Sequence, residues 1–148
     1  MEINRINVLI SLLQYAGGIQ GRTRLQKLVF LLQKEHGISL GYEFRPYNWG
    51  PLSFELQNDL NWLVAQGIVT ECITEFSETG GRRYDYLLSE WGKDYFHRVI
   101  EPSISKEVKD AILALIRKWG SESIQKLLDY VHQKYPEYCL PPAHSVLE

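Results

Sequence analysis

The stretch from Arg45 to Gly67 limits the possible folds of this chain more than any other part of its sequence. The Gly50-Pro51 pair interrupts regular structure, because glycine frees φ and proline fixes it. Ser53 follows at a position where its side chain can cap a helix. Apolar residues then recur at helical spacing, at Leu56, Leu60, Leu63 and Val64. We therefore predict an amphipathic helix after Ser53 that buries its leucine face.

A second helix is expected before this stretch, and a β-ribbon after it. The earlier helix opens with Thr23 to Gln26, which form a capping box of the Thr-x-x-Gln type, and Gly37 is expected just past its end. Residues 69–76 are rich in β-branched side chains, and residues 83–88 alternate beyond a Gly80-Gly81 turn. Helix, turn, helix and two-stranded wing form the order of a winged helix-turn-helix, which is the fold we predict.

Further elements are expected on either side of this motif. Apolar spacing from Ile3 predicts a first helix that stops at Ala16. Tyr42–Arg45 is interpreted as a short extended segment or an edge strand. After the wing, a helix from Glu90 to about Ile100 is predicted, with a buried side formed by Trp91, Tyr95, Phe96 and Val99.

The sequence predicts a boundary at residues 101–103. Residues 1–101 would form the winged-helix domain, and residues 102–148 a helical pair with a tail, packed on that domain. The two helices, over residues 108–119 and 124–135, are predicted to be antiparallel neighbours because the turn between them is short. The tail from Cys139 contains Pro141-Pro142 and is expected to be extended, and Leu147-Glu148 is assigned no role. The fold class is thus mainly α with a small β wing.

Composition excludes some classes of protein. The net charge is −2 and the sequence pI about 6.1, which is not the strongly basic balance of a dedicated nucleic-acid-binding protein. Cys72 and Cys139 match no metal spacing, so we expect a reducing cytoplasmic setting and no metal. No leader opens the chain and no apolar run approaches the length of a membrane span.

No pattern in the chain indicates catalysis. The four histidines are scattered, and the glycine-rich run at residues 17–21 lacks the ending of a phosphate loop. Glu55 and Asp59 lie four residues apart on one helical face, which is typical of a solvated surface. We therefore predict a protein that is not an enzyme and needs no cofactor.

Binding to double-stranded DNA is the leading functional prediction. In a winged helix-turn-helix, the exposed face of the third helix meets base edges. Here that face would carry Gln57, Asn58 and Asn61. The residues expected to hold phosphates, or to anchor the wing, are Arg22, Arg24, Lys27, Arg45, Arg82 and Arg83. The simpler interpretation of the last two is that they pair with Glu75 and Glu78 across the ribbon.

A protein-binding function is the alternative. Residues 51–80 contain five acidic residues and no Lys or Arg, a charge that would repel DNA. The acidic helix face, with Glu55 and Asp59, would then bind a protein partner together with the nearby Tyr47 and Trp49. The aromatic residues of this segment are nevertheless expected mostly in the core; they are Tyr42, Phe44, Tyr47 and Trp49. A homodimer through the last helix's tyrosines also stays open; they are Tyr130, Tyr135 and Tyr138.

Three motifs resemble those of one family. They are Gly-Arg-Thr-x-x-Gln-Lys-x-x-Phe-Leu at residues 21–31, Tyr-x-Phe-x-Pro-Tyr-x-x-Gly-Pro-x-Ser-x-x-Leu at 42–56, and Leu-Leu-x-Tyr-Val-x-x-x-Tyr-Pro at 127–136. Together they resemble YwgA-like proteins. Leu-Gln-Lys-Leu at residues 25–28 and the Gly50-Pro51 pair are also similar to the Panacea, or SocA-like, antitoxin domain, with Trp49 where tyrosine is usual. The resemblance implies a prokaryotic winged-helix-like protein linked with regulation, toxin neutralisation or mobile-element defence, and it supplies no catalytic residue.

Overall fold

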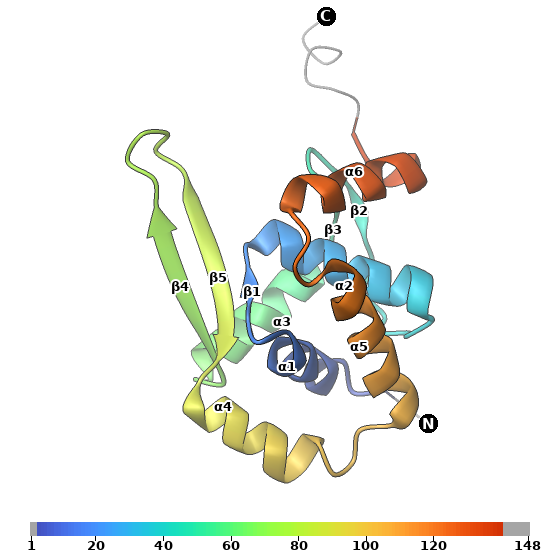
Figure 1. The fold of residues 1–148 in the computed structure, drawn as a ribbon. Coiled ribbons are helices and arrows are strands. Elements are labelled where there is room, and N and C mark those ends of the chain that lie inside the picture. The colour runs from blue at the N-terminus through green and yellow to red at the C-terminus, as the bar shows by residue number, and fades with distance from the viewer. Residues whose placement is uncertain (1–2, 141–148) are drawn as a thin grey trace, which may run out of the picture.

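The computed structural model describes residues 3–140, which form a mainly helical structure with two small antiparallel sheets (Figure 1). Within that range the α-helices are α1 (Arg5–Ala16), α2 (Arg22–His36), α3 (Phe54–Ala65), α4 (Glu90–Tyr95), α5 (Lys106–Trp119) and α6 (Ile124–Lys134). The strands are β1 (Ile19–Gln20), β2 (Arg45–Tyr47), β3 (Gly50–Leu52), β4 (Val69–Glu75) and β5 (Arg82–Leu88). One sheet has the order β1-β5-β4, and β2 and β3 form the other. The extended tail predicted at Pro141-Pro142 lies outside the described residues.

The leucine-striped helix α3 is confirmed. The Ser53 hydroxyl oxygen caps it by accepting from the Leu56 amide at 3.2 Å. Three of its stripe residues are buried, namely Leu56, Leu60 and Leu63, whereas Val64 is half-buried. Gly67 follows the helix with a φ of 76°, a conformation that favours glycine. The apolar face of α3 is thus fixed as the sequence predicts.

The start of α2 differs from the prediction. Its N-cap is Gly21 and no side chain caps it, so Thr23 lies inside the first turn and forms no capping box. The side-chain amide of Gln26 bonds instead to the backbone of Ser53. Its Nε2 donates to the Ser53 carbonyl oxygen at 2.9 Å, and its Oε1 accepts from the Ser53 amide at 2.8 Å. Gln26 therefore fastens α2 to the start of α3, a long-range partnership that local spacing does not reveal.

A hairpin separates α2 from α3. The predicted extended segment Tyr42–Arg45 is misplaced, because the strand is β2 and it pairs with β3, with Pro46 opposite Pro51. Residues 37–53 therefore connect the two helices, a longer link than the tight turn of the predicted motif. The Nζ of Lys27 in α2 donates to the Pro51 carbonyl oxygen at 3.0 Å, which holds the hairpin against α2.

The predicted two-stranded ribbon is confirmed. β4 and β5 pair from Val69 opposite Leu88 to Glu75 opposite Arg82, and the ribbon projects beyond the helices (Figure 1). The sequence did not indicate β1, which is only two residues long and pairs with β5 on its other side. Tyr86 of β5 is fully buried, so the ribbon's base belongs to the core.

The helix after the ribbon is shorter than expected. α4 ends at Tyr95, and Phe96–Ile100 form a wider π-helical turn in which the Glu101 amide donates to the Phe96 carbonyl oxygen at 2.8 Å. Phe96 and Ile100 are buried. Trp91 and Val99, which were expected in the core, are exposed. From Phe96 onward the wider turn changes which side chains face inward, and a uniform helical period cannot anticipate this change.

Helices α5 and α6 are confirmed, but their predicted antiparallel pairing is wrong. Both helices pack on α2, and α6 runs across the direction of α5 (Figure 1). Glu35 of α2 holds α6 in place, because its carboxylate accepts from Tyr130, Lys134 and Tyr135 at 2.7–2.8 Å. The apolar residues of both helices join one core cluster with those of α1 and α2.

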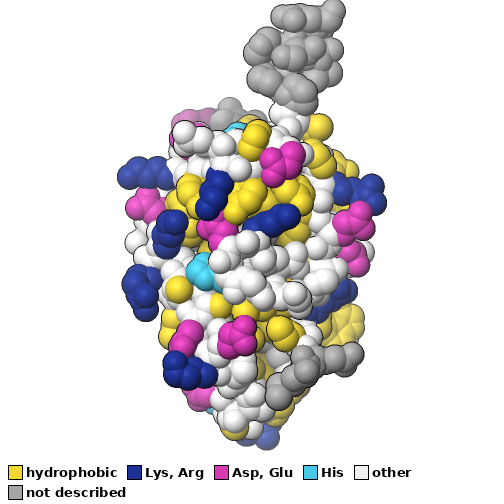
Figure 2. All heavy atoms as spheres, turned by 90° about the vertical axis from the view of Figure 1, so that its right-hand side faces the viewer, with side chains coloured by type: hydrophobic (Ala, Val, Ile, Leu, Met, Phe, Trp, Pro, Cys, Tyr) yellow, Lys and Arg dark blue, Asp and Glu magenta, His cyan; other side chains and the backbone are white. Residues whose placement is uncertain are grey.

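The outer surface near the α2–α6 contact combines aromatic and basic side chains. Figure 2 shows this side of the molecule, where basic side chains lie over a band of hydrophobic ones. Lys34 lies 4.9 Å from the ring centre of Tyr138, and Lys118 lies 4.8 Å from that of Tyr130. Such contacts cover the rings while leaving the charges in water.

No helix within residues 3–140 is both long enough and apolar enough to cross a membrane.

Candidate nucleic-acid interface

Four arginines meet where β5 passes the N-terminus of α2. They line an open cleft of about 450 Å³, which we call the arginine cleft. Its lining contains no acidic side chain among the described residues. The lining residues are Gln20, Gly21, Arg22, Thr23, Arg24, Arg82, Arg83, Tyr84 and Ile124. The cleft therefore gathers four basic side chains on a chain whose net charge is −2, and the acids that pair with three of them lie outside its lining.

Backbone pairing explains why these arginines converge. Gln20 lies opposite Asp85 in the sheet, and the Gly21 amide donates to the Tyr84 carbonyl oxygen at 3.0 Å. Gly21 turns the chain with a φ of 96°, so α2 begins directly beside β5. Arg22 and Arg24 come from the first turn of α2, whose positive dipole end adds to their charge.

Arg22 is held firmly at the centre of this surface. Its guanidinium lies 3.6 Å from the ring centre of Tyr84, and its Nε donates to the Tyr86 hydroxyl at 2.9 Å. Tyr86 in turn donates to the carboxylate of Glu71 at 2.6 Å, which also lies 3.4 Å from Arg22 Nη2. The side chain of Arg22 is still 41% exposed, so part of its guanidinium is free to meet a ligand.

The other three arginines of the cleft also have partners within the chain. Arg24 donates to the Glu122 carbonyl oxygen at 2.9 Å, and burial lowers its pKa. Arg82 pairs with Glu75 across the ribbon at 3.3 Å, as the simpler interpretation predicted. Arg83 pairs with Asp85 at 2.9 Å and not with Glu78. The exposed Arg82–Glu75 pair contributes only about 0–1 kcal/mol, so a phosphate can displace Glu75 at small cost. Arg83 is held more firmly, because it donates three hydrogen bonds to the half-buried carboxylate of Asp85.

Lys27 and Arg45 do not line the arginine cleft. Lys27 is buried, with 2% exposure, and burial lowers its pKa to about 8. Its Nζ donates to Pro51, so its position supports a structural function and not the predicted contact with phosphate. Arg45 is exposed on β2 and pairs with Glu43 at 3.0 Å.

The three amides of α3 lie on its solvent side, as expected. Asn58 and Asn61 are exposed, and Gln57 is half-buried. Gln57 Nε2 donates to Asn61 Oδ1 at 3.0 Å, which fixes the orientation of both side chains. Of the three, Gln57 is the one that lines a cavity beside the arginine cleft.

That neighbouring cavity has a volume of about 280 Å³ and aromatic walls, and we call it the aromatic pocket. Its lining consists of Arg22, Thr23, Gln26, Lys27, Tyr47, Asn48, Trp49, Leu52, Phe54 and Gln57. The prediction that the aromatic residues of this segment lie in the core is right for Tyr42. It is wrong for Tyr47 and for Trp49, and the exposure of Trp49 is 65%. Phe54 is 59% exposed and meets the Tyr47 ring edge-on at 5.5 Å. The arginine cleft and the aromatic pocket share Arg22 and Thr23.

The acidic residues of the alternative protein interface also make contacts within the chain. Asp59 accepts from the Tyr42 hydroxyl at 2.6 Å and pairs with Arg5 at 2.9 Å, which ties α1 and the loop before β2 to α3. Burial and the bond to Asp59 raise the pKa of Tyr42. Glu55 accepts from the Glu43 amide at 3.3 Å. Charge reversal at Asp59 would therefore disturb the fold as well as any surface.

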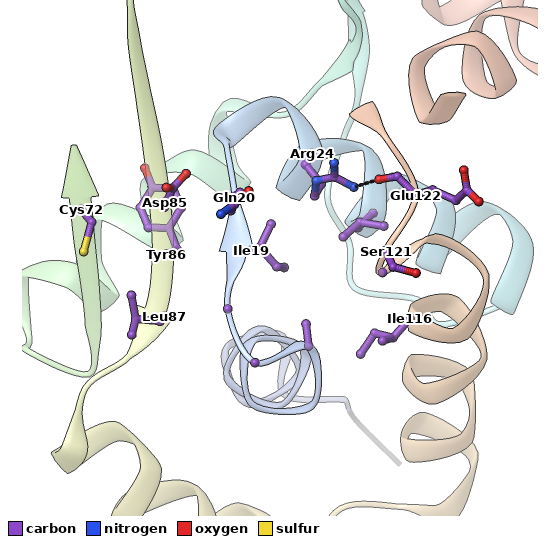
Figure 3. Close-up of a pocket in the computed structure, with 15 residues that line it drawn as sticks. Ile19, Gln20, Arg24, Cys72, Asp85, Tyr86, Leu87, Ile116, Ser121 and Glu122 are labelled. Atoms are coloured by element: carbon purple, nitrogen blue, oxygen red, sulfur yellow. Dashed lines mark hydrogen bonds between the residues drawn. The ribbon is translucent and has the colours of Figure 1, made fainter. Parts of the chain in front are cut away.

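A third cavity, of about 580 Å³, shares Gln20 and Arg24 with the arginine cleft (Figure 3). It lies between the sheet and the turn that joins α5 to α6. Figure 3 shows Cys72, Asp85 and Leu87 on the sheet side, and Ser121 and Glu122 on the far side of β1. Its lining mixes charges of both signs, which does not indicate an anion site.

Sequence patterns missed several residues of these cavities. Tyr84 and Phe54 were not singled out, although the alternation of residues 83–88 placed Tyr84 on the same ribbon face as Tyr86. Within the described range, no group of three or more His, Cys, Asp or Glu is placed to hold a metal ion. The chain matches no protein-family model and no curated protein.

Proposed function

We propose that this chain is a winged-helix regulatory protein that binds double-stranded DNA and has no catalytic activity of its own. The observation that carries the proposal is the convergence of four arginines from α2 and β5 on one cleft without acidic side chains. Phosphate contacts supply most of the affinity of such proteins.

The order of the elements supports the winged-helix assignment. α1, β1, α2, α3 and the β4–β5 ribbon follow one another, and β1 pairs with β5 to complete a three-stranded sheet. The hairpin between α2 and α3 would be an addition to that plan. In this assignment the ribbon is the wing, Arg82 and Arg83 hold one strand's backbone, and α3 presents Asn58 and Asn61 to the groove.

The proposal places the protein in a prokaryotic cytoplasm. Cys72 and Cys139 are both free thiols, as expected of a reducing compartment. The resemblance to YwgA-like proteins and to the Panacea antitoxin domain favours a regulatory or defence-related function. Because the chain as a whole is slightly acidic, binding would depend on the local charge of the cleft.

The test is the salt dependence of binding to a fluorescent duplex, measured by anisotropy. Arg82→Ala with Arg83→Ala should weaken binding and reduce the slope of log Kd against log salt by about 2. The matched control is Arg98→Ala with Arg117→Ala, which removes the same charge from exposed positions outside the cleft. Absence of salt-dependent binding by the unmutated protein would contradict the proposal.

A protein-binding function is the second candidate, and the exposure of the aromatic pocket favours it. Trp49 and Phe54 present large apolar surfaces to solvent, as the central residues of protein interfaces often do. This candidate predicts that Trp49→Ala removes a co-purifying partner and that the protein has no affinity for duplex DNA.

A further inference from the structure

We infer that the aromatic pocket receives one unpaired base of the bound nucleic acid, so that the preferred ligand is a duplex with an adjoining single-stranded segment. This inference rests on the proposed function, because it assigns the backbone of that ligand to the arginine cleft. It names a ligand class that duplex binding alone does not require.

The first argument is the continuity of the two cavities. Arg22 and Thr23 line both of them, so a strand whose phosphates lie in the arginine cleft passes directly over the mouth of the aromatic pocket. Arg22 is fixed between Tyr84 and Tyr86 and cannot swing away to close this route without losing both contacts.

The second argument is the chemistry of the walls. Tyr47, Trp49 and Phe54 offer exposed ring faces and edges, on which every base can stack. In a blunt duplex each base is already stacked on its neighbours and leaves these rings unused. An unpaired base has free faces, and the amide of Gln57 can pair with its edge.

Charge complementarity is the third argument. The ionisable side chains that line the pocket are those of Arg22, Lys27 and Tyr47, and no acid is among them. The nearby Glu71 is not among the lining residues, and its carboxylate is engaged by the Tyr86 hydroxyl and by Arg22 Nη2, the latter at 3.4 Å. A nucleotide brings one negative phosphate and one neutral ring system, which matches a basic rim with aromatic walls.

The pocket is also preorganised. Gln26 holds Ser53 through two hydrogen bonds, and Lys27 holds Pro51, so the hairpin and the start of α3 are fixed on α2 behind the aromatic rings. A ligand entering such a pocket loses little affinity to ordering of the protein. The buried side chains of Gln26 and Lys27 thus shape this pocket.

Three fluorescent oligonucleotides test the inference. They are a blunt duplex, the same duplex with a five-nucleotide overhang, and that duplex with an abasic overhang, which keeps the phosphates and removes the bases. The overhang should bind about tenfold more tightly than its abasic counterpart, and it should quench tryptophan fluorescence.

The decisive variant is Trp49→Leu, and the matched control is Trp62→Leu. Trp62 is 51% exposed on α3 and lines none of the three cavities described above, so both changes remove an exposed indole without opening the core. Trp49→Leu should abolish the difference between normal and abasic overhangs, and Trp62→Leu should preserve it. Thermal melts of both variants verify that the fold is retained.

The outcomes separate this inference from the proposed function. Equal, salt-dependent binding of all three oligonucleotides would overturn the unpaired base and leave duplex binding intact. No binding of any oligonucleotide would overturn both. If an acidic phenylalanine-containing peptide quenches Trp49 and no oligonucleotide does, the pocket is a protein-binding site and the inference is wrong.

Discussion

Gln26 and Ser53 exchange two hydrogen bonds in the interior of the protein. The Ser53 amide donates to Gln26 Oε1 at 2.8 Å, and Gln26 Nε2 donates to the Ser53 carbonyl oxygen at 2.9 Å. Both residues are buried, with exposures of 2% and 0%. A side-chain amide thus completes the backbone hydrogen bonding of a residue that begins the next helix, and it fixes α2 relative to α3.

Removing this amide should be costly. Gln26→Leu leaves the buried Ser53 N–H without a partner, whereas the Ser53 carbonyl oxygen still accepts from the Gln57 amide, so we expect a loss of about 1–3 kcal/mol in the free energy of unfolding. Gln125→Leu is the control, because Gln125 is exposed and bonds only to Asp129 on its own helix. Urea denaturation measures both. A loss below about 1 kcal/mol for Gln26→Leu would show that the bonds do not fix α3.

Lys27 predicts an unusual dependence of stability on pH. Burial lowers its folded pKa to about 8 from an ordinary value of 10.5. Between these values the unfolded chain binds more protons, so the contribution of Lys27 to stability rises with pH. The free energy of unfolding of the unmutated protein, relative to Lys27→Met, should increase by up to about 3 kcal/mol from pH 8 to pH 10.5. If urea titrations show the same stability difference between the two proteins across this range, the pKa of Lys27 is not lowered by burial.

Glu35 predicts a loss of stability at acidic pH. Burial alone would raise its pKa, but hydrogen bonds from Lys134, Tyr130 and Tyr135 outweigh burial and hold the pKa below its ordinary value. A lowered carboxyl pKa stabilises the fold above pH 4.5 and loses that effect as pH falls through the folded value. Glu35→Gln should therefore cost about 1–3 kcal/mol at pH 7 and much less at pH 3. An equal cost at both values of pH would rule out a charged contribution.

Gly92 allows no side chain where α4 meets the turn between α3 and β4. A Cβ at this position would overlap the Ile68 carbonyl group. Ser89 accepts the Gly92 amide hydrogen bond at 3.0 Å, so α4 cannot easily shift to make room. We expect Gly92→Ala to destabilise the protein by about 1–3 kcal/mol, in contrast to its exposed neighbour in Lys93→Ala. Melting temperatures compare the two, and a neutral Gly92→Ala would show that this contact is loose.

Local patterns predicted much of the fold because they depend on near neighbours. The leucine spacing of α3 and the alternation of β5 reflect one buried face each, and both predictions are confirmed. The two-residue strand β1 is too short to carry a periodic signal. The partner of Gln26 lies 27 residues away along the chain, beyond the reach of a local pattern. Local spacing predicted a capping box between Thr23 and Gln26 instead, and that prediction is wrong.

The candidate site was only partly predictable for the same reason. Arg22, Arg24, Arg82 and Arg83 were selected by charge and position, but their meeting in one cleft depends on the pairing of β1 with β5. Lys27 has the same charge and lies on the same helix, yet it points inward to Pro51. Residue type alone also placed Trp49 in the core, whereas the β2–β3 hairpin carries it into solvent.

The central claim is that phosphates bind in the arginine cleft, and arginine side-chain NMR tests it most directly. Each Nε–Hε group gives its own signal, so addition of a duplex with an overhang identifies the arginines that make contact. We predict that Arg22, Arg24, Arg82 and Arg83 shift together, while Arg98 and Arg117 stay unchanged. Unchanged signals from the cleft at saturating ligand, or shifts confined to arginines outside it, would contradict the claim.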